Sequence, residues 1–147
     1  MITPRDFLHV ARELVQRTSE AHWRSAVSRA YYAAFHAGRL LLADLGFRVP
    51  QADRAHSSGW LRLANCGDPA TQSFARDLNA LRGRRNQADY DLRLSVVQST
   101  VFGQVQLAAR VIQAFEAAAQ PPLRAAVTAA VRDYERDVLG DVTYQGR

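Results

Sequence analysis

Proline, glycine and capping residues divide this chain into long segments that have the periodicity of α-helices. Thr3-Pro4-Arg5-Asp6 has the pattern of a helix start: a capping threonine, a proline in the first turn and an acid three residues after the cap. Asp68-Pro69 has a similar cap-plus-proline pattern, and Gly46 and Gly140 stand where a helix is expected to end. The expected helices span residues 4–18, 20–45, 54–64, 69–89, 96–119 and 123–139, with a loop over 47–53.

Helices joined by short connections predict an all-α protein folded as an antiparallel up-and-down bundle of five to six helices. The composition agrees, because the chain is rich in alanine, leucine and arginine and contains only 8 glycines and 5 prolines among 147 residues. We expect a single domain over residues 1–147, with an additional C-terminal helix within 121–140. No internal repeat and no strand pattern is present in the sequence.

Several classes of protein are disfavoured by what the sequence lacks. His36, Arg39 and Asp44 interrupt the best apolar run before it reaches membrane-spanning length, and the N-terminus has no apolar signal core, so we expect a cytoplasmic protein without a membrane partner. The single cysteine, Cys66, has no partner for an internal disulfide. The sequence carries no metal-ligand motif and no cofactor-binding motif, so no metal and no cofactor is expected.

All 19 basic residues are arginines. The absence of lysine excludes a phosphate-binding-loop lysine, a Schiff base and a lysine general base. The formal net charge of +5 is compatible with a polyanionic partner such as RNA, although such an excess is also common on ordinary solvated surfaces.

The most unusual position is Arg85, which falls on the apolar stripe of the helix that follows Asp68-Pro69. Phe74, Leu78 and Leu81 recur there at three- and four-residue steps, and the next places are Arg85 and Ala88. A guanidinium that faces a core has to be paired or line a polar cleft. Asp89, four residues further along, is the expected partner.

A second polar stripe lies on the long helix over 20–45. Ser28, Tyr32, His36 and Arg39 share one face of an alanine-rich helix, at steps of three or four residues. Such a stripe either lines a cleft or satisfies its own hydrogen bonds inside the bundle. For His36 alone, the structural role is the favoured interpretation.

Segments 28–37 (SRAYYAAFHA) and 81–90 (LRGRRNQADY) together resemble the HEPN family, whose name stands for higher eukaryotes and prokaryotes nucleotide binding. The resemblance covers about residues 4–115. It implies a helical bundle that forms a homodimer, with the polar motifs facing a shared cleft. Family members include metal-independent endoribonucleases and toxins of toxin–antitoxin or defence systems. Others bind RNA or nucleotides and are encoded beside a minimal nucleotidyltransferase.

The ribonuclease branch of that family carries an arginine, a polar residue, a short spacer and a histidine. Arg85 and Asn86 match the first two positions, but Tyr90 stands where the histidine would be, and no histidine follows His56. A tyrosine with a pKa near 10 is a poor base at neutral pH, whereas a histidine near 6.5 suits proton transfer. The Ala-Asp-Tyr form is more similar to the branch associated with RNA or nucleotide binding.

Three functions therefore stay open. The first is an RNA- or nucleotide-binding protein of a prokaryotic toxin–antitoxin or defence gene pair, the second a metal-independent endoribonuclease, and the third a non-catalytic dimerisation or docking partner of a nucleotidyltransferase. The candidate binding residues are Ser28, Tyr32, Arg82, Arg84, Arg85 and Asp89. The candidate catalytic residues, if the protein is an enzyme, are His36, Arg85, Asn86 and Tyr90.

Overall fold

The computed structural model describes residues 1–51 and 54–146. Within these residues the chain forms six α-helices and no strand, so the predicted all-α helical bundle is confirmed. The helices are α1 (Pro4–Val15), α2 (Glu20–Asp44), α3 (Arg54–Leu63), α4 (Pro69–Tyr90), α5 (Gln98–Ala118) and α6 (Leu123–Tyr134), followed by the π-helical turn η1 (Glu135–Leu139). Residues 52 and 53, at the end of the expected 47–53 loop, and residue 147 lie outside the described residues.

The chain divides into two compact units. Unit 1 comprises residues 1–36 and 77–112, and unit 2 comprises residues 37–76 and 113–147. The boundaries fall inside α2, α4 and α5, so each of these helices contributes one part to unit 1 and the other part to unit 2.

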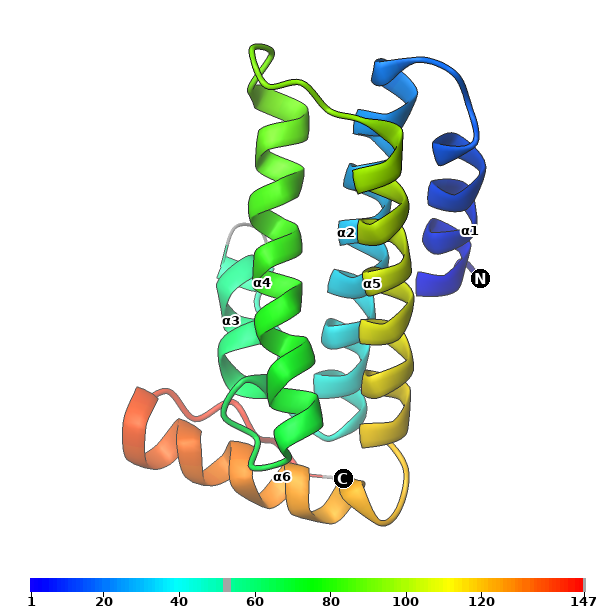
Figure 1. The fold of residues 1–147 in the computed structure, drawn as a ribbon. Coiled ribbons are helices and arrows are strands. Elements are labelled where there is room, and N and C mark those ends of the chain that lie inside the picture. Colours follow the sequence, from blue (N-terminus) through cyan, green and yellow to red (C-terminus); the bar gives the residue numbers. More distant parts are fainter. Residues whose placement is uncertain (52–53, 147) are drawn as a thin grey trace. The chain divides into compact units, whose positions relative to one another are not determined.

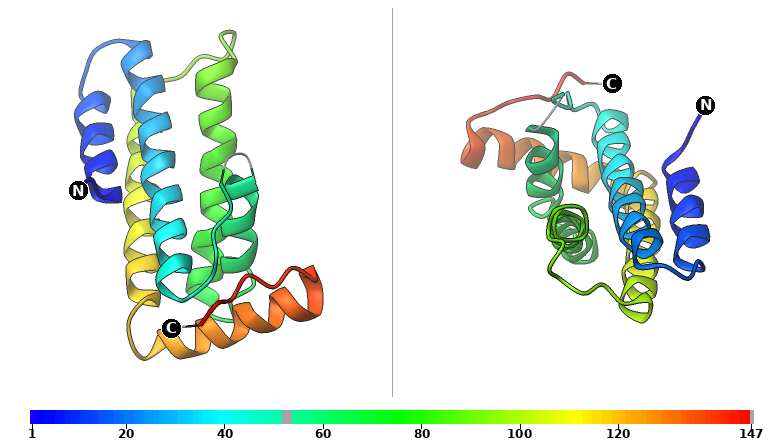
Figure 2. Two further views of the ribbon diagram at one scale, coloured as in Figure 1. Left: turned by 180° about the vertical axis from the view of Figure 1, so that it is seen from behind. Right: turned by 90° about the horizontal axis from the view of Figure 1, so that it is seen from above.

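Unit 1 contains α1, the part of α2 up to residue 36, the part of α4 from residue 77 and the part of α5 up to residue 112. Each helix runs antiparallel to its neighbour along the chain, and α1 lies beside α2 (Figures 1 and 2). Alanines on α2 keep the helix surface narrow, which permits close approach of the neighbouring helices. The core is made of buried apolar side chains from all four helices, among them Leu8, Val15, Val27, Ala30, Leu81, Val101, Val105 and Ala108.

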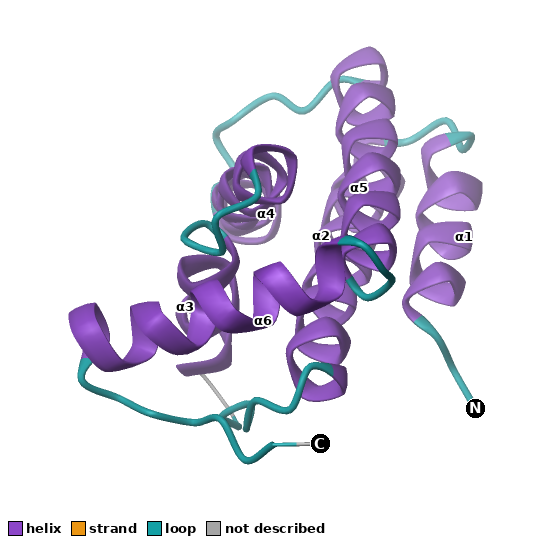
Figure 3. Ribbon diagram, turned by 90° about the horizontal axis from the view of Figure 1, so that it is seen from below, coloured by secondary structure: helices purple, strands orange, loops and turns teal. Residues whose placement is uncertain are grey.

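Unit 2 contains α3, α6 and the C-terminal tail, together with the remaining parts of α2, α4 and α5. Figure 3 shows α6 crossing α3 instead of lying alongside it. The tail returns to the end of α2, where Phe47 and Tyr144 form an isolated antiparallel bridge. Gly46 has a φ of 101°, a left-handed conformation that glycine adopts without strain and that ends α2 at the predicted place.

The last helix differs from its prediction. The sequence predicted one helix over 123–139, but the α-helical hydrogen bonding ends at Tyr134 and residues Glu135–Leu139 form the π-helical turn η1. The carbonyl of Glu135 accepts a hydrogen bond from the N–H of Asp141, beyond the left-handed Gly140. The carbonyl of the first residue of this turn is therefore satisfied by backbone N–H groups that follow the turn.

Two other helix ends differ from their predicted positions by a few residues. The first helix ends at Val15 instead of residue 18, and the fifth begins at Gln98 instead of residue 96. Helix ends fray, and such shifts are ordinary. None of the helices in the described part of the chain is long and apolar enough to cross a lipid bilayer.

Candidate functional site

Arg85 lies on the inner side of α4, within unit 1. Its neighbours on the stripe, Leu78, Leu81 and Ala88, are all buried, and the side chain of Arg85 itself is only 17% exposed. The apolar periodicity of α4 thus positions a permanently charged group where water has little access. Such a group requires polar partners from the protein.

Three residues hold the Arg85 guanidinium. Nη1 donates to Oδ1 of Asn86 at 2.9 Å, and Nη2 donates to the hydroxyl oxygen of Tyr32, on α2, also at 2.9 Å. Nε lies 3.1 Å from Oδ2 of Asp89, which makes an ion pair. The N–H of Nε is not aligned with this oxygen, so the buried Nε makes no hydrogen bond. A guanidinium carries five N–H groups. One N–H on each Nη is hydrogen-bonded and the N–H of Nε faces Asp89, so the second N–H of each Nη is left without an acceptor among the described residues.

Asp89 makes a second contact between α4 and α2, in addition to the bond between Arg85 and Tyr32. The hydroxyl of the buried Ser28 donates to Oδ2 of Asp89 at 3.4 Å, the same oxygen that faces Arg85. The carboxylate balances the guanidinium charge and limits its rotation. We call Ser28, Tyr32, Arg85, Asn86 and Asp89 the Arg85 cluster.

Aromatic rings border the Arg85 cluster. The ring of Tyr32 has two guanidinium carbons near it, Arg29 and Arg85, each 5.2 Å from the ring centroid. Arg85 also lies 5.7 Å from the ring of Tyr90, which is 74% exposed. Cations over ring faces are attracted by the π-electrons, so the rings add to the positioning of Arg85.

Tyr31, the neighbour of Tyr32, is excluded from acid–base chemistry by burial. Loss of hydration raises the pKa of Tyr31 to about 12, while the nearby positive charges of Arg82 and Arg85 lower it by less. The phenol therefore stays neutral throughout the physiological range. Its ring stacks on Phe35 with a centroid separation of 5.8 Å, as expected for a core residue.

His36 lies one turn beyond Tyr32 on the same face of α2. Its ring is 6.2 Å from the ring of Tyr32 and 5.0 Å from the ring of Phe7, so the imidazole packs where α1 meets α2. Arg29 lies between the same two aromatic rings, 5.6 Å from that of Phe7. The imidazole is thus part of an aromatic and cationic arrangement that includes Tyr32.

The other two arginines of the segment behave differently from Arg85. Arg82 is half-buried on α4, and its charge acts on the Tyr31 hydroxyl. Arg84 is exposed. Within residues 1–51 and 54–146, no hydrogen bond or ion pair holds either side chain. Of the predicted binding residues, the structure therefore brings Ser28, Tyr32, Arg85 and Asp89 into direct contact, whereas Arg82 and Arg84 lie outside the cluster.

Two arginines of α2, Arg24 and Arg29, make contacts that the sequence patterns did not predict. Arg24 donates through Nη1 to the backbone carbonyls of Ala88 and Asp91, both at 2.9 Å, and through Nη2 to the carbonyl of Leu94. It therefore satisfies carbonyl groups at the C-terminal end of α4. These acceptors lie 64–70 residues away in the chain, so no local pattern signals the contact.

No group of histidine, cysteine and acidic side chains with the arrangement of a metal site occurs in the described part of the chain. Comparison with protein-family models found no matching family. Searches of curated proteins and of solved structures found no significant match either. The Arg85 cluster is therefore the feature of the molecule that bears on function.

Proposed function

We propose that this chain is a HEPN-like protein that binds RNA or a nucleotide through Arg85. The observation that supports the proposal is a guanidinium, 17% exposed, that is held on three sides and keeps two N–H groups without an acceptor among the described residues. Two N–H groups on different nitrogens match two oxygens of one phosphate. Because Tyr32, Asn86 and Asp89 already hold the side chain, little conformational entropy is lost when a phosphate binds.

The exposed ring of Tyr90 complements this contact. It lies 5.7 Å from the Arg85 guanidinium carbon and offers a face on which a base stacks while the phosphate binds the arginine. Stacking of this kind contributes about 1–3 kcal/mol per base and tolerates any sequence. Together with the net charge of +5, these features favour single-stranded RNA over an uncharged ligand.

The test is fluorescence anisotropy with a labelled single-stranded oligoribonucleotide. We expect Arg85→Ala to weaken binding by about tenfold or more, since charge-assisted hydrogen bonds are lost. Arg110→Ala is the matched control, because Arg110 is also in unit 1, is exposed and has no described side-chain partner. Equal loss in the two variants would mean that only net charge matters, and the proposal would be wrong.

The same proteins, incubated with cellular RNA in EDTA, distinguish binding from cleavage. We expect intact RNA, because the position of the family's catalytic histidine is occupied by Tyr90. Products that end in 2′,3′-cyclic phosphate and disappear with Arg85→Ala would instead establish the endoribonuclease. His36→Ala and Tyr90→Phe would then identify the base.

A second candidate function is supported by the connection between α4 and α5. Three large apolar side chains are exposed there, with Leu92 at 84%, Val97 at 48% and Leu94 at 39%. Exposed apolar clusters of this kind are typical of protein interfaces. We propose that this segment forms a homodimer contact beside the Arg85 cluster, as one component of a toxin–antitoxin or defence gene pair.

Sedimentation equilibrium tests the dimer. The wild-type chain is expected to dimerise, and Leu92→Asp is expected to give monomers. A monomeric wild-type chain that co-purifies with a nucleotidyltransferase would replace the homodimer by the docking function.

A further inference from the structure

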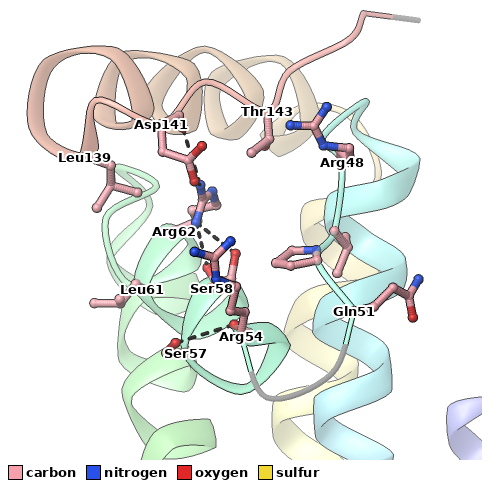
Figure 4. Close-up of a pocket in the computed structure, with 12 residues that line it drawn as sticks. Arg48, Gln51, Arg54, Ser57, Ser58, Leu61, Arg62, Leu139, Asp141 and Thr143 are labelled. Atoms are coloured by element: carbon pink, nitrogen blue, oxygen red, sulfur yellow. Dashed lines mark hydrogen bonds and ion pairs between the residues drawn. The ribbon is translucent and has the colours of Figure 1, made fainter.

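Unit 2 contains a polar cavity that shares no residue with the Arg85 cluster. Its volume is about 730 Å³, within the range of pockets that bind small molecules. Figure 4 shows its walls, which come from the segment after α2, from α3, from the end of η1 and from the tail that follows it. We call it the Arg48–Arg54 pocket, after the two arginines that line it from different segments.

One arginine in the wall is fully engaged by the protein. Arg62 is 4% exposed; its Nε donates to Glu135 at 2.7 Å, Nη1 to the Ser58 hydroxyl at 2.9 Å, and Nη2 to Asp141 Oδ2 at 3.2 Å. Arg62 therefore shapes the pocket and neutralises the acids near it. Because the Ser58 oxygen accepts this bond, its own O–H is directed elsewhere.

Arg48 and Arg54 are in the opposite situation. Both are exposed, and neither guanidinium has a hydrogen bond or ion pair with the part of the chain that the structure describes. Among the described residues of the pocket and its wall, three arginines stand against two acids, Glu135 and Asp141, so positive charge is in excess. Two unpaired guanidinium groups that line one cavity favour a bound anion.

The donors of the pocket and its apolar wall define the class of anion. Arg48, Arg54 and the Ser58 hydroxyl are three separate donors, and a phosphate monoester offers three acceptor oxygens with nearly two negative charges at neutral pH. Leu61 and Leu139 line the same cavity and are suited to an apolar body. We propose that the Arg48–Arg54 pocket binds a small organic phosphate monoester, with its phosphate on Arg48, Arg54 and Ser58.

The experiment is isothermal titration calorimetry with phenyl phosphate, inorganic phosphate and benzoate as probes. In the Arg85→Ala background, which lacks the phosphate contact proposed in unit 1, we expect one phenyl phosphate per chain, bound more tightly than inorganic phosphate because the ring buries apolar surface. Arg48→Ala and Arg54→Ala should each weaken binding by about tenfold, and the double variant should abolish it. Neither replacement removes a described side-chain contact, so both variants are expected to fold, which circular dichroism checks.

Two controls separate this site from others. The Arg85→Ala background removes the phosphate contact proposed in unit 1. Arg76→Ala, at an exposed arginine of unit 2 that does not line the pocket, should leave the binding of phenyl phosphate unchanged. The proposal is wrong if the Arg85→Ala background shows no saturable binding, if the double variant in that background still binds, or if benzoate binds as tightly as phenyl phosphate. The binding of phenyl phosphate in this pocket does not depend on whether the chain binds RNA.

Discussion

Tyr32 orients Arg85 without having to touch a ligand itself. Its hydroxyl oxygen accepts the bond from Arg85 Nη2, and its ring lies under the same guanidinium. Tyr32→Phe keeps the ring and leaves one N–H of a mostly buried cation without its acceptor. We expect the free energy of unfolding to fall by about 1 kcal/mol and RNA affinity to fall less than in Arg85→Ala.

Urea denaturation and anisotropy measure the two effects of Tyr32→Phe. Tyr90→Phe is the matched control, since the Tyr90 side chain is 74% exposed and its hydroxyl has no described partner. A loss of stability as large in Tyr90→Phe would mean that the Tyr32–Arg85 bond contributes nothing specific.

Asp6 makes the stability of α1 depend on pH. Its carboxylate accepts the N–H of Thr3 at 2.6 Å, and this bond holds the pKa of Asp6 below its usual 3.8. A lowered folded-state pKa stabilises the fold above the unfolded-state value, and that contribution is lost as pH falls through the folded-state pKa. We expect Asp6→Asn to lower Tm at neutral pH, and we expect the difference from the wild type to shrink over the range from neutral pH to below 3.8. Thermal melts followed by circular dichroism across this range test it; a constant difference would contradict the carboxylate's role.

The sequence predicted where the helices begin and end better than it predicted the contacts between them. Thr3-Pro4, Gly46 and Asp68 act through bonds to near neighbours, such as Asp68 Oδ2 accepting the N–H of Thr71 at 2.9 Å, so a local pattern reveals them. The stripe of α4 likewise predicted that Arg85 is mostly buried and faces Asp89. The contacts of Arg24 and the turn η1 depend on residues far along the chain or on tertiary packing, and no periodicity encodes them.

Arg24 stabilises the C-terminal end of α4. Its side chain is 12% exposed and donates to three backbone carbonyls between Ala88 and Leu94. Arg24→Ala should lower the free energy of unfolding by about 1.5–3 kcal/mol and accelerate amide hydrogen exchange over residues 88–97. Arg110→Ala, which removes an exposed arginine, should leave both unchanged. Unaltered exchange in Arg24→Ala would show that the end of α4 does not need this residue.

The ion pair between Arg62 and Glu135 joins α3 to the turn η1. The Glu135 side chain is 0% exposed and also accepts the N–H of Thr143 at 3.0 Å, which fixes the tail. Glu135→Gln leaves a buried guanidinium without its main counter-charge, so we expect a loss of about 3–5 kcal/mol in denaturant unfolding. Asp137→Asn, a change in an exposed ion pair of the same turn, should cost less than about 1 kcal/mol. Similar losses in both would mean that the buried pair is not a stabilising contact of the tail.

For the molecule as a whole, a net charge of +5 predicts that RNA affinity depends on salt. Each phosphate contact to a single strand contributes about −0.7 to the slope of log K against log salt concentration, because counterions are released. Arg85→Ala should reduce the magnitude of the slope by about 0.7, whereas Tyr32→Phe should weaken binding with the slope almost unchanged. Affinities measured between about 50 and 200 mM salt test this contrast. A slope that is the same in all three proteins would exclude a phosphate contact by Arg85.

The division of α2, α4 and α5 between the two compact units has a consequence during synthesis on the ribosome. Residues 37–76, which belong to unit 2, are made between the two halves of unit 1, and unit 1 lacks its last segment until residue 112 has been added. Neither unit is encoded by one uninterrupted stretch of the gene. A stop codon or a single protease cut therefore cannot release either unit free of residues of the other.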